Sequence, residues 1–230
     1  MPLASVKLTA PVPHPPKLMM GGRNYTRHID ELRGTDATIP VPPTPRIFAK
    51  YHTAITGPGD PVVYPRMVKQ LDFEGEFSVV IGRTARYVKE EDALDFVGGY
   101  TIVNDVTARC IQATGELIVS KNFATFAPMG PWIVTPDEIP DPHDLGVRTY
   151  LNGRQVSEAH TSEMLFNIPQ YIAFLSQVFP LEPGDVLTTG SPPGPGMYHN
   201  PPILTEIGDT MRVEVEHVGT LENRVVPEAT

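Results

Sequence analysis

Proline restricts the architectures open to this sequence more than any other residue, because it lacks a backbone N–H, ends helices and is confined to the edges of sheets. The 230 residues include 26 prolines and 19 glycines, a share close to that of low-complexity chains. The prolines are nevertheless scattered between apolar runs and form no tract. They indicate turns and strand edges in a β-rich, loop-rich fold.

Alternation of apolar and polar side chains predicts the strands. The clearest case is residues 70–81, where one side would carry Leu71, Phe73, Phe77, Val79 and Ile81 and the other Asp72, Glu74, Glu76 and Ser78. This pattern predicts a half-buried strand. Further strands are expected at 46–51, 100–106 and 132–135, and after the turns at Gly184 and Gly208. The pair Asn152-Gly153 is typical of a tight hairpin.

Helical patterns are few. Thr26 can cap a short helix that reaches Arg33, residues 90–96 suggest a second helix, and Asn167 can cap a third that runs to about residue 178. The apolar spacing of the third helix suits either a core or a subunit interface. So few helices cannot connect parallel strands throughout, and the sequence predicts an α+β fold of mixed sheets that is predominantly β.

Charge and composition narrow the classes of partner. The net charge is −9, from 18 basic and 27 acidic residues, and no basic run is present to follow nucleic-acid phosphates. No apolar stretch approaches the roughly 20 residues of a membrane span, the N-terminus lacks a secretory pattern, and Cys110 is the single cysteine. We expect a cytoplasmic protein without nucleic-acid or membrane partners, with an extended segment at residues 1–16 and one domain at 17–230.

Three acidic residues are candidate metal ligands. Glu74 and Glu76 would project side by side from one strand, which suits a hard divalent cation but also describes a solvated strand face. Asp105 lies in the apolar run 100–106, where burying an unpaired carboxylate would be costly. It caps a turn, meets a cation, or pairs with Arg109 four residues further along the chain.

His28 and Glu31 are candidates for a general base and the carboxylate that orients it. Their spacing puts both on one face of the predicted helix, where Glu31 can fix one imidazole tautomer. His28 can equally be an exposed helix histidine, and Lys121 an ordinary surface lysine. Four basic residues in candidate loops suit an anionic substrate despite the acidic net charge: Arg23, Arg27, Lys50 and Arg109.

In combination and in order, these segments resemble the fumarylacetoacetate hydrolase family, in particular its compact, single-domain members. The resemblance spans about residues 17–223, and its motifs are weak singly but specific together. They are Gly22-Arg23-Asn24-Tyr25 with His28 and Glu31, Asp72-Phe73-Glu74-Gly75-Glu76, Asn104-Asp105 with Arg109 and Gln112, and Lys121-Asn122-Phe123. Thr189-Gly190-Ser191-Pro192 departs mildly from the family's usual Thr-Gly-Thr-Pro.

The resemblance implies a fold and a set of roles. The fold would be the family's mixed β-sandwich roll with a few short helices. Glu74, Glu76 and Asp105 would bind Mg²⁺ or Mn²⁺, His28 and Glu31 would lie on a lid helix, and Lys121 would contact the reacting oxygens. The positions that match substrate contacts are Arg23, Tyr25, Arg109, Gln112 and Thr189. Family members are commonly homodimers, and a homodimer is expected here.

The favoured function is hydrolysis of a C–C bond in an acylpyruvate-type or fumarylpyruvate-type 2-keto acid through a metal-bound enolate, with water activated by His28. The nearest alternative is an isomerase, tautomerase or decarboxylase acting on a 2-oxo dicarboxylate such as oxaloacetate or an oxo-heptenedioate, because these reactions develop the same enolate charge. A more remote alternative is a non-catalytic metal-binding module that has kept the fold.

Overall fold

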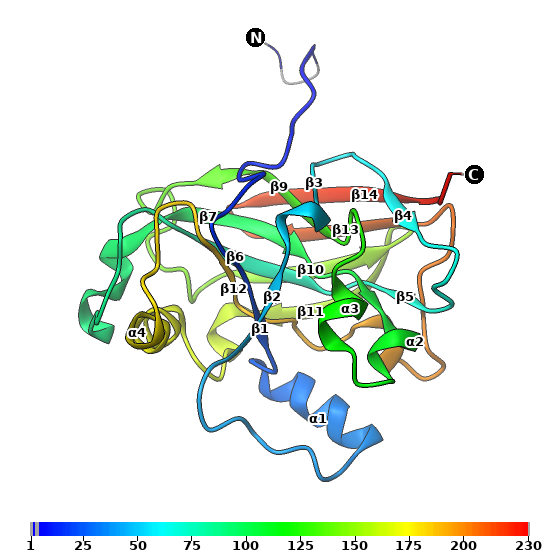
Figure 1. Ribbon diagram of the computed structural model, residues 1–230, viewed down its shortest axis with the longest axis horizontal. Helices are drawn as coiled ribbons and strands as arrows, with labels where there is room; N and C mark the ends of the chain where they lie inside the picture. Colours follow the sequence, from blue (N-terminus) through cyan, green and yellow to red (C-terminus); the bar gives the residue numbers. More distant parts are fainter. Residues whose placement is uncertain (1, 3–4, 230) are drawn as a thin grey trace.

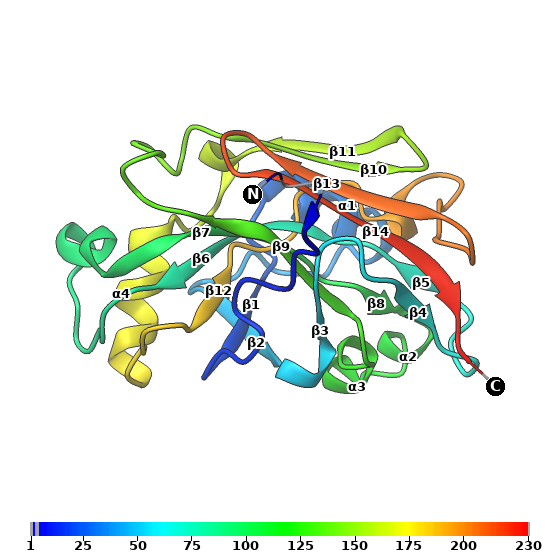
Figure 2. The same ribbon diagram turned by 90° about the horizontal axis from the view of Figure 1, so that it is seen from above.

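Two β-sheets stacked face to face form the body of the molecule, and short helices surround one of them (Figures 1 and 2). The computed structural model describes residues 2 and 5–229. The strands of the larger sheet are β1 (Leu18–Gly22), β2 (Arg46–Lys50), β3 (Ile55–Thr56), β6 (Gly75–Ile81), β7 (Val97–Asn104), β9 (Ala127–Val134) and β12 (Val186–Thr188). Those of the smaller sheet are β4 (Val62–Tyr64), β10 (Gly146–Leu151), β11 (Arg154–His160), β13 (Thr210–Val215) and β14 (Gly219–Pro227).

The remaining elements are short. β5 (Leu71–Asp72) and β8 (Thr107–Ala108) form a separate antiparallel pair. The α-helices are α1 (Thr26–Thr35), α2 (Arg109–Gln112), α3 (Leu117–Lys121) and α4 (Ile168–Val178). The 3₁₀ turns are η2 (His52–Ala54), η3 (Glu90–Phe96), η4 (Thr161–Glu163) and η5 (Gly196–Tyr198). None of the helices among the described residues has the length and apolar character needed to cross a bilayer.

Strand order confirms the predicted mixed topology. The larger sheet runs β2-β1-β12-β6-β7-β9-β3 and the smaller one β11-β10-β13-β14-β4. β1 pairs in parallel with β12, β3 with β9 and β4 with β14, whereas the other pairs are antiparallel. The fold is therefore α+β and predominantly β, as the residue patterns and the family resemblance both predict. Most of the core lies between the two sheets, where side chains such as Phe77 and Val213 meet.

The structure corrects the prediction of one half-buried strand over residues 70–81. The chain breaks at Phe73 and Glu74, between β5 and β6, and every residue of β6 is buried. The reason is that β6 lies inside the larger sheet and both of its faces are covered. Phe77 packs in the core between the sheets, while Val80 packs in a second cluster with Ala10 of the N-terminal segment.

Local signals predicted the hairpin and the longest helix correctly. Asn152 and Gly153 both adopt positive φ between β10 and β11, as their type of turn requires. Asn167 caps α4 by accepting a hydrogen bond from the backbone N–H of Gln170. The apolar face of α4 is used in the core, which decides between the two interpretations of its spacing. Thr26, in contrast, is the first residue of α1 and does not cap it.

Gly75 allows the two sheets to approach closely beside the candidate metal ligands. A Cβ atom at this position would lie 2.6 Å from Thr149 Oγ1 and 2.7 Å from both Val213 methyl carbons. The residue between Glu74 and Glu76 must therefore be glycine for the larger sheet to seat on β10 and β13 at this point. This contact links the packing of the sheets to the position of the acidic residues.

Gly75→Ala should lower the free energy of unfolding by about 1–3 kcal/mol, because overpacking displaces Thr149 or Val213. Gly34→Ala is the matched control, since no atom lies within 4 Å of its added Cβ and alanine favours the helix. Urea unfolding of both variants measures the difference. Equal midpoints for Gly75→Ala and the wild type would contradict the proposed close approach.

Candidate metal centre

Three carboxylates meet where β6 and β7 lie side by side. Glu74, Glu76 and Asp105 are buried, and one oxygen of each lies within 4.8 Å of the others. The register explains this convergence, because Gly75 pairs with Asn104 and the Asp105 N–H donates to the Glu74 carbonyl at 2.8 Å. The Asn104 side chain accepts from the Glu74 N–H at 3.0 Å. These three acids therefore form a buried cluster of the oxygen ligands that hard divalent cations prefer.

Two buried lysines neutralise part of this cluster. Lys121 Nζ donates to Glu74 Oε2 at 2.8 Å and to Asp105 Oδ2 at 2.6 Å. Lys50 Nζ donates to Asp105 Oδ1 at 2.6 Å and to the carbonyls of Val106 and Phe126. Burial, together with the nearby charge of Lys121, lowers the pKa of Lys50 to about 8, although Asp105 offsets part of this effect. Asp105 is thus held on both oxygens, and its partners are lysines instead of the Arg109 that the sequence offered as one alternative.

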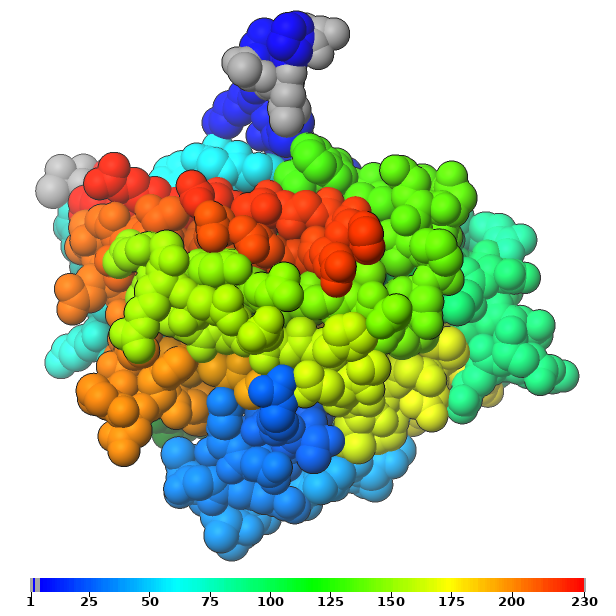
Figure 3. All heavy atoms as spheres, turned by 180° about the vertical axis from the view of Figure 1, so that it is seen from behind, coloured from blue at the N-terminus to red at the C-terminus, as the bar shows by residue number. Residues whose placement is uncertain are grey.

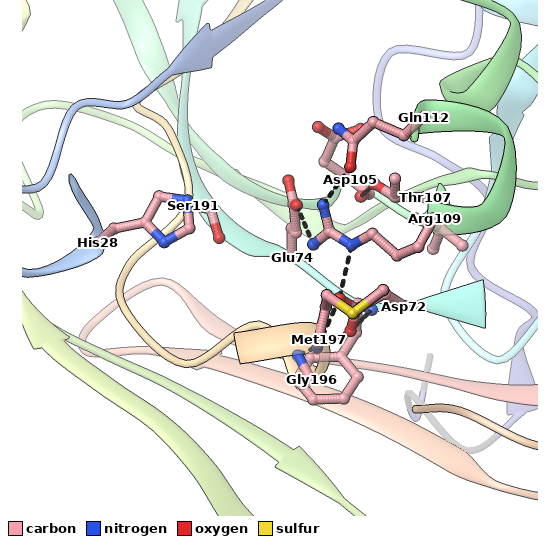
Figure 4. Close-up of polar contacts among 12 residues, drawn as sticks. His28, Asp72, Glu74, Asp105, Thr107, Arg109, Gln112, Ser191, Gly196 and Met197 are labelled. Carbon is pink, nitrogen blue, oxygen red and sulfur yellow. Dashed lines mark hydrogen bonds and ion pairs between the residues drawn. The ribbon is translucent and has the colours of Figure 1, made fainter. Parts of the chain in front are cut away.

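Arg109 connects the cluster to a neighbouring loop, as Figure 4 shows. Its Nε donates to Asp72 Oδ2 at 2.7 Å, one terminal nitrogen donates to Gln112 at 2.8 Å, and the other donates to Glu74. Asp72 accepts in addition from the N–H groups of Gly196 and Met197 in η5, at 2.7 and 3.1 Å. Asp72 therefore fixes both the guanidinium group of Arg109 and the loop that carries η5.

Glu76 shows that the residues present fit a divalent cation. Neither of its carboxylate oxygens has a hydrogen-bond partner in the part of the chain that the structure describes. Burial, with Asp105 and Glu74 adding to it, raises the pKa of Glu76 well above its ordinary value. Burial would also raise the pKa of Glu74, but Lys121 and Arg109 outweigh burial and hold it well below that range. A buried, unpartnered carboxylate beside two others is the donor set that a cation would complete.

A cavity of about 300 Å³ opens onto Glu74 and Glu76, with His28 in its wall. His28 Nδ1 lies 3.0 Å from Glu31 Oε2, and the same oxygen accepts from the Gly194 N–H at 3.1 Å. The Tyr198 ring meets the His28 ring edge-on, with centroids 5.4 Å apart. Since Nδ1 is engaged by Glu31, Nε2 is the ring nitrogen left to exchange a proton with a bound molecule.

The predicted substrate contacts divide into two groups. Arg23, Arg109 and Gln112 line the cavity. Tyr25 has no exposed surface, Thr189 donates to the Phe77 carbonyl at 2.9 Å, and neither is among the lining residues. A role for these two residues in binding stays a prediction.

Two basic residues expected to face a substrate have other partners. Arg27 is exposed and pairs with Glu163 at 2.6 Å. Lys50 is buried and pairs with Asp105 at 2.6 Å.

The partners of Asp72 and Lys50 could not be identified from the local sequence, although both residues were named there. Asp72 and Lys50 act through partners 37 and 55 positions away, and a single sequence carries no signal for such pairings. Arg46 and Tyr198 line the cavity but belong to a strand and a proline-rich loop without a distinctive motif. The one available signal was Lys50 itself, a charged residue at the end of an apolar strand.

Glu76→Gln tests the unpartnered carboxylate. Its raised pKa means that the folded protein holds this proton more tightly than the unfolded chain, so unfolding should become easier as pH rises above about 4.5. With EDTA present, Glu76→Gln should be more stable than the wild type by about 1–3 kcal/mol at pH 8, and the difference should shrink towards pH 5. Urea unfolding at both pH values measures it, and parallel pH profiles would contradict this assignment.

Lys50→Met should destabilise the protein by about 3–5 kcal/mol, because it leaves the buried Asp105 carboxylate without one of its two cationic partners. Lys89→Met is the control, since Lys89 pairs with Glu91 on the surface, where side-chain exposures are 74% and 72%. Thermal and urea unfolding compare the two variants. A Lys50→Met protein as stable as the control would contradict the role of Lys50.

Comparison with known proteins agrees with this geometry. The chain is 40% identical over 226 residues to an oxaloacetate tautomerase of Xenopus laevis named as mitochondrial, covering 97% of this chain and 69% of that protein. A human protein of the same description is 38% identical over 229 residues, covering 98% and 71%.

Solved structures are similar as well. The 2-hydroxyhepta-2,4-diene-1,7-dioate isomerase of Mycobacterium marinum matches with a TM-score of 0.84 and 39% identity, covering all of this chain and 81% of that one. The maleylpyruvate hydrolase of Sphingobium sp. SYK-6, solved with manganese(II) and pyruvate, gives 0.83 and 33%, covering 100% and 77%. The profile described as fumarylacetoacetate (FAA) hydrolase C-terminal matches residues 17–226. The chain belongs to the fumarylacetoacetate hydrolase family.

Proposed function

We propose that this protein is a metal-dependent tautomerase that interconverts the keto and enol forms of a small 2-oxo acid, with oxaloacetate as the first substrate to test. The observation that carries the proposal is one cavity lined both by His28, whose Nδ1 lies 3.0 Å from Glu31 Oε2, and by two of the three clustered carboxylates, Glu74 and Glu76. A base beside a cation site is the minimum that keto–enol exchange needs, because it requires only proton transfer and stabilisation of the enolate charge.

The three carboxylates would hold the cation, and Mg²⁺ or Mn²⁺ suits their oxygen donors. When bound, the cation supplies positive charge at the substrate oxygens where the enolate charge develops. The unpartnered Glu76 and the lysine-bound Asp105 are proposed as ligands with Glu74. Lys121, which lies between Glu74 and Asp105, keeps two of these ligands close together and is proposed to contact the reacting oxygens.

His28 is proposed to move the proton. Nε2 removes a proton from the carbon next to the keto group, and the electron pair of that C–H bond becomes the enolate. Glu31 supports the resulting imidazolium through Nδ1. The His28 imidazolium then returns its proton to the enolate oxygen, which gives the enol and restores the neutral imidazole, and the reverse order returns the keto acid. No water molecule needs to be activated in either direction.

The identity of the relatives favours this reaction over the hydrolysis that the sequence first suggested. Proteins named oxaloacetate tautomerases align over 97–98% of the chain at 38–40% identity, and an isomerase is among the similar structures. The cavity of about 300 Å³ is at the small end of ligand sites and suits a molecule of a few carbons.

C–C bond hydrolysis is the second candidate, supported by the similarity to a maleylpyruvate hydrolase. It would use the same base to activate water for attack on a distal carbonyl. Decarboxylation of a 2-oxo dicarboxylate would use the same enolate. A homodimer and a cytoplasmic location also stay predictions.

His28→Asn should lower kcat for oxaloacetate tautomerisation by about 10²- to 10⁴-fold, because it removes the base. Binding of Mn²⁺, followed by calorimetry, should persist. Loss of enol absorbance in the presence of Mg²⁺ or Mn²⁺ measures turnover, and mass spectrometry identifies products. Release of CO₂, or a carboxylic acid fragment carrying oxygen from labelled water, would replace the proposed reaction with decarboxylation or hydrolysis. Metal binding without turnover of any 2-oxo acid would indicate a non-catalytic module.

A further inference from the structure

Two of the four arginine and lysine side chains in the cavity wall have no carboxylate partner. Arg23, Arg46, Arg109 and Lys121 all line the cavity. Arg109 is paired with Asp72 and Glu74, and Lys121 with Glu74 and Asp105. Across the described residues, in contrast, neither Arg23 nor Arg46 has a carboxylate oxygen within 4.0 Å or a side-chain hydrogen bond. Their charge is therefore available to a ligand.

The backbone brings these two arginines together. Gly22, the last residue of β1, pairs with Arg46, the first residue of β2. A Cβ atom on Gly22 would lie 3.9 Å from the Arg46 Cβ, so no side chain stands between the strands here. Arg23 follows at once and adopts a left-handed conformation with φ of 54°. Backbone strain at a residue other than glycine is typical of functional positions.

Placing the two positive charges of Arg23 and Arg46 close together costs free energy unless an anion binds between them. Burial and the nearby Arg46 both lower the pKa of Arg23, which is the expected effect of bringing a second guanidinium close. Arg46 is exposed and Arg23 is half-buried, so the pair lies where the cavity meets solvent. Guanidinium groups bind carboxylates through paired hydrogen bonds, which makes a carboxylate the fitting anion.

We propose that Arg23 and Arg46 form a subsite for a second carboxylate, which makes the protein selective for 2-oxo dicarboxylates over 2-oxo monocarboxylates. The proposal rests on the proposed function, because it assumes that the 2-oxo acid end of the substrate lies at the Glu74, Glu76 and Asp105 cluster. The remainder of a bound molecule then faces the other lining residues, where the two arginines are the unpaired charges.

The test compares two substrates that differ at one group. Oxaloacetate carries the second carboxylate, and 2-oxobutanoate has a methyl group in its place. Exchange of the C3 protons for deuterium, followed by NMR in the Mn²⁺-free, Mg²⁺-loaded protein, reports enolisation of both. Arg46→Met and Arg23→Met keep the aliphatic stem and remove the charge. Arg224→Met is the control, because Arg224 is exposed on β14 and does not line the cavity, and Figure 1 shows β14 on the opposite side of the molecule from α1.

Each cavity variant should lower the ratio of kcat/KM for oxaloacetate to kcat/KM for 2-oxobutanoate by about 10- to 100-fold, the effect of losing a charge-assisted hydrogen bond. The loss should fall mainly on KM, and Arg224→Met should keep the wild-type ratio. Unfolding midpoints equal to the wild type show that the variants are folded. An unchanged ratio in both cavity variants would overturn the subsite.

Failure of the proposed function would give a different result. If the wild-type protein exchanges no C3 protons, calorimetry of the Mg²⁺-loaded protein with oxaloacetate, 2-oxobutanoate and oxalate replaces the kinetic ratio. Oxalate reports the cation end alone. Weaker binding of oxaloacetate to Arg46→Met, with oxalate affinity retained, would support the subsite without tautomerase activity. Equal affinity of oxaloacetate for the variant and the wild type would overturn it.

Discussion

Repulsion among three buried carboxylates is the constraint on which the rest of the site depends. Glu74, Glu76 and Asp105 are brought together by backbone pairing, and low polarity makes their mutual repulsion strong. Lys50, Lys121 and Arg109 offset the charge of Glu74 and Asp105 but leave Glu76 unpaired. The network thus stabilises the fold while keeping one carboxylate uncompensated, which makes the cluster receptive to a cation.

The same network links the site to the packing of the sheets. Gly75 lies between two of the acids and against the smaller sheet, so the distance between the sheets fixes where Glu74 and Glu76 point. Asp72 extends the network through Arg109 to the loop of η5, whose Tyr198 ring lies against His28. His28, the carboxylate cluster and the loop of η5 are consequently joined by one continuous set of contacts. Figure 3 shows the segment that contains α1, in blue, beside the orange loop on the molecular surface.

The features that the sequence predicted correctly are those fixed by residues close together in the chain, such as turns, helix starts and the spacing of side chains on one helix. The spacing of His28 and Glu31 indicated that these two side chains would lie side by side, whereas the alternation around Glu74 and Glu76 predicted one continuous strand where the chain breaks at Phe73 and Glu74. Asn152-Gly153 and the Asn167 cap predicted a turn and a helix start for the same reason. The parallel pairing of β1 with β12, the break before β6 and the burial of Lys50 depend on contacts between distant segments. No short sequence pattern encodes these long-range contacts. The residues alone left open whether Glu74, Glu76 and Asp105 come together, and the family resemblance was the reason to expect that they do.

The base resides on an excursion between two adjacent strands. Because Gly22 pairs with Arg46, residues 23–45 leave the sheet and return to it at the same place, carrying α1 and His28 with them. Such a segment is a long connection between two paired strands, and the strands can stay in register whatever the length of the connection. The position of His28 is therefore set by this connection, whereas the positions of the three carboxylates are set by the pairing of β6 with β7.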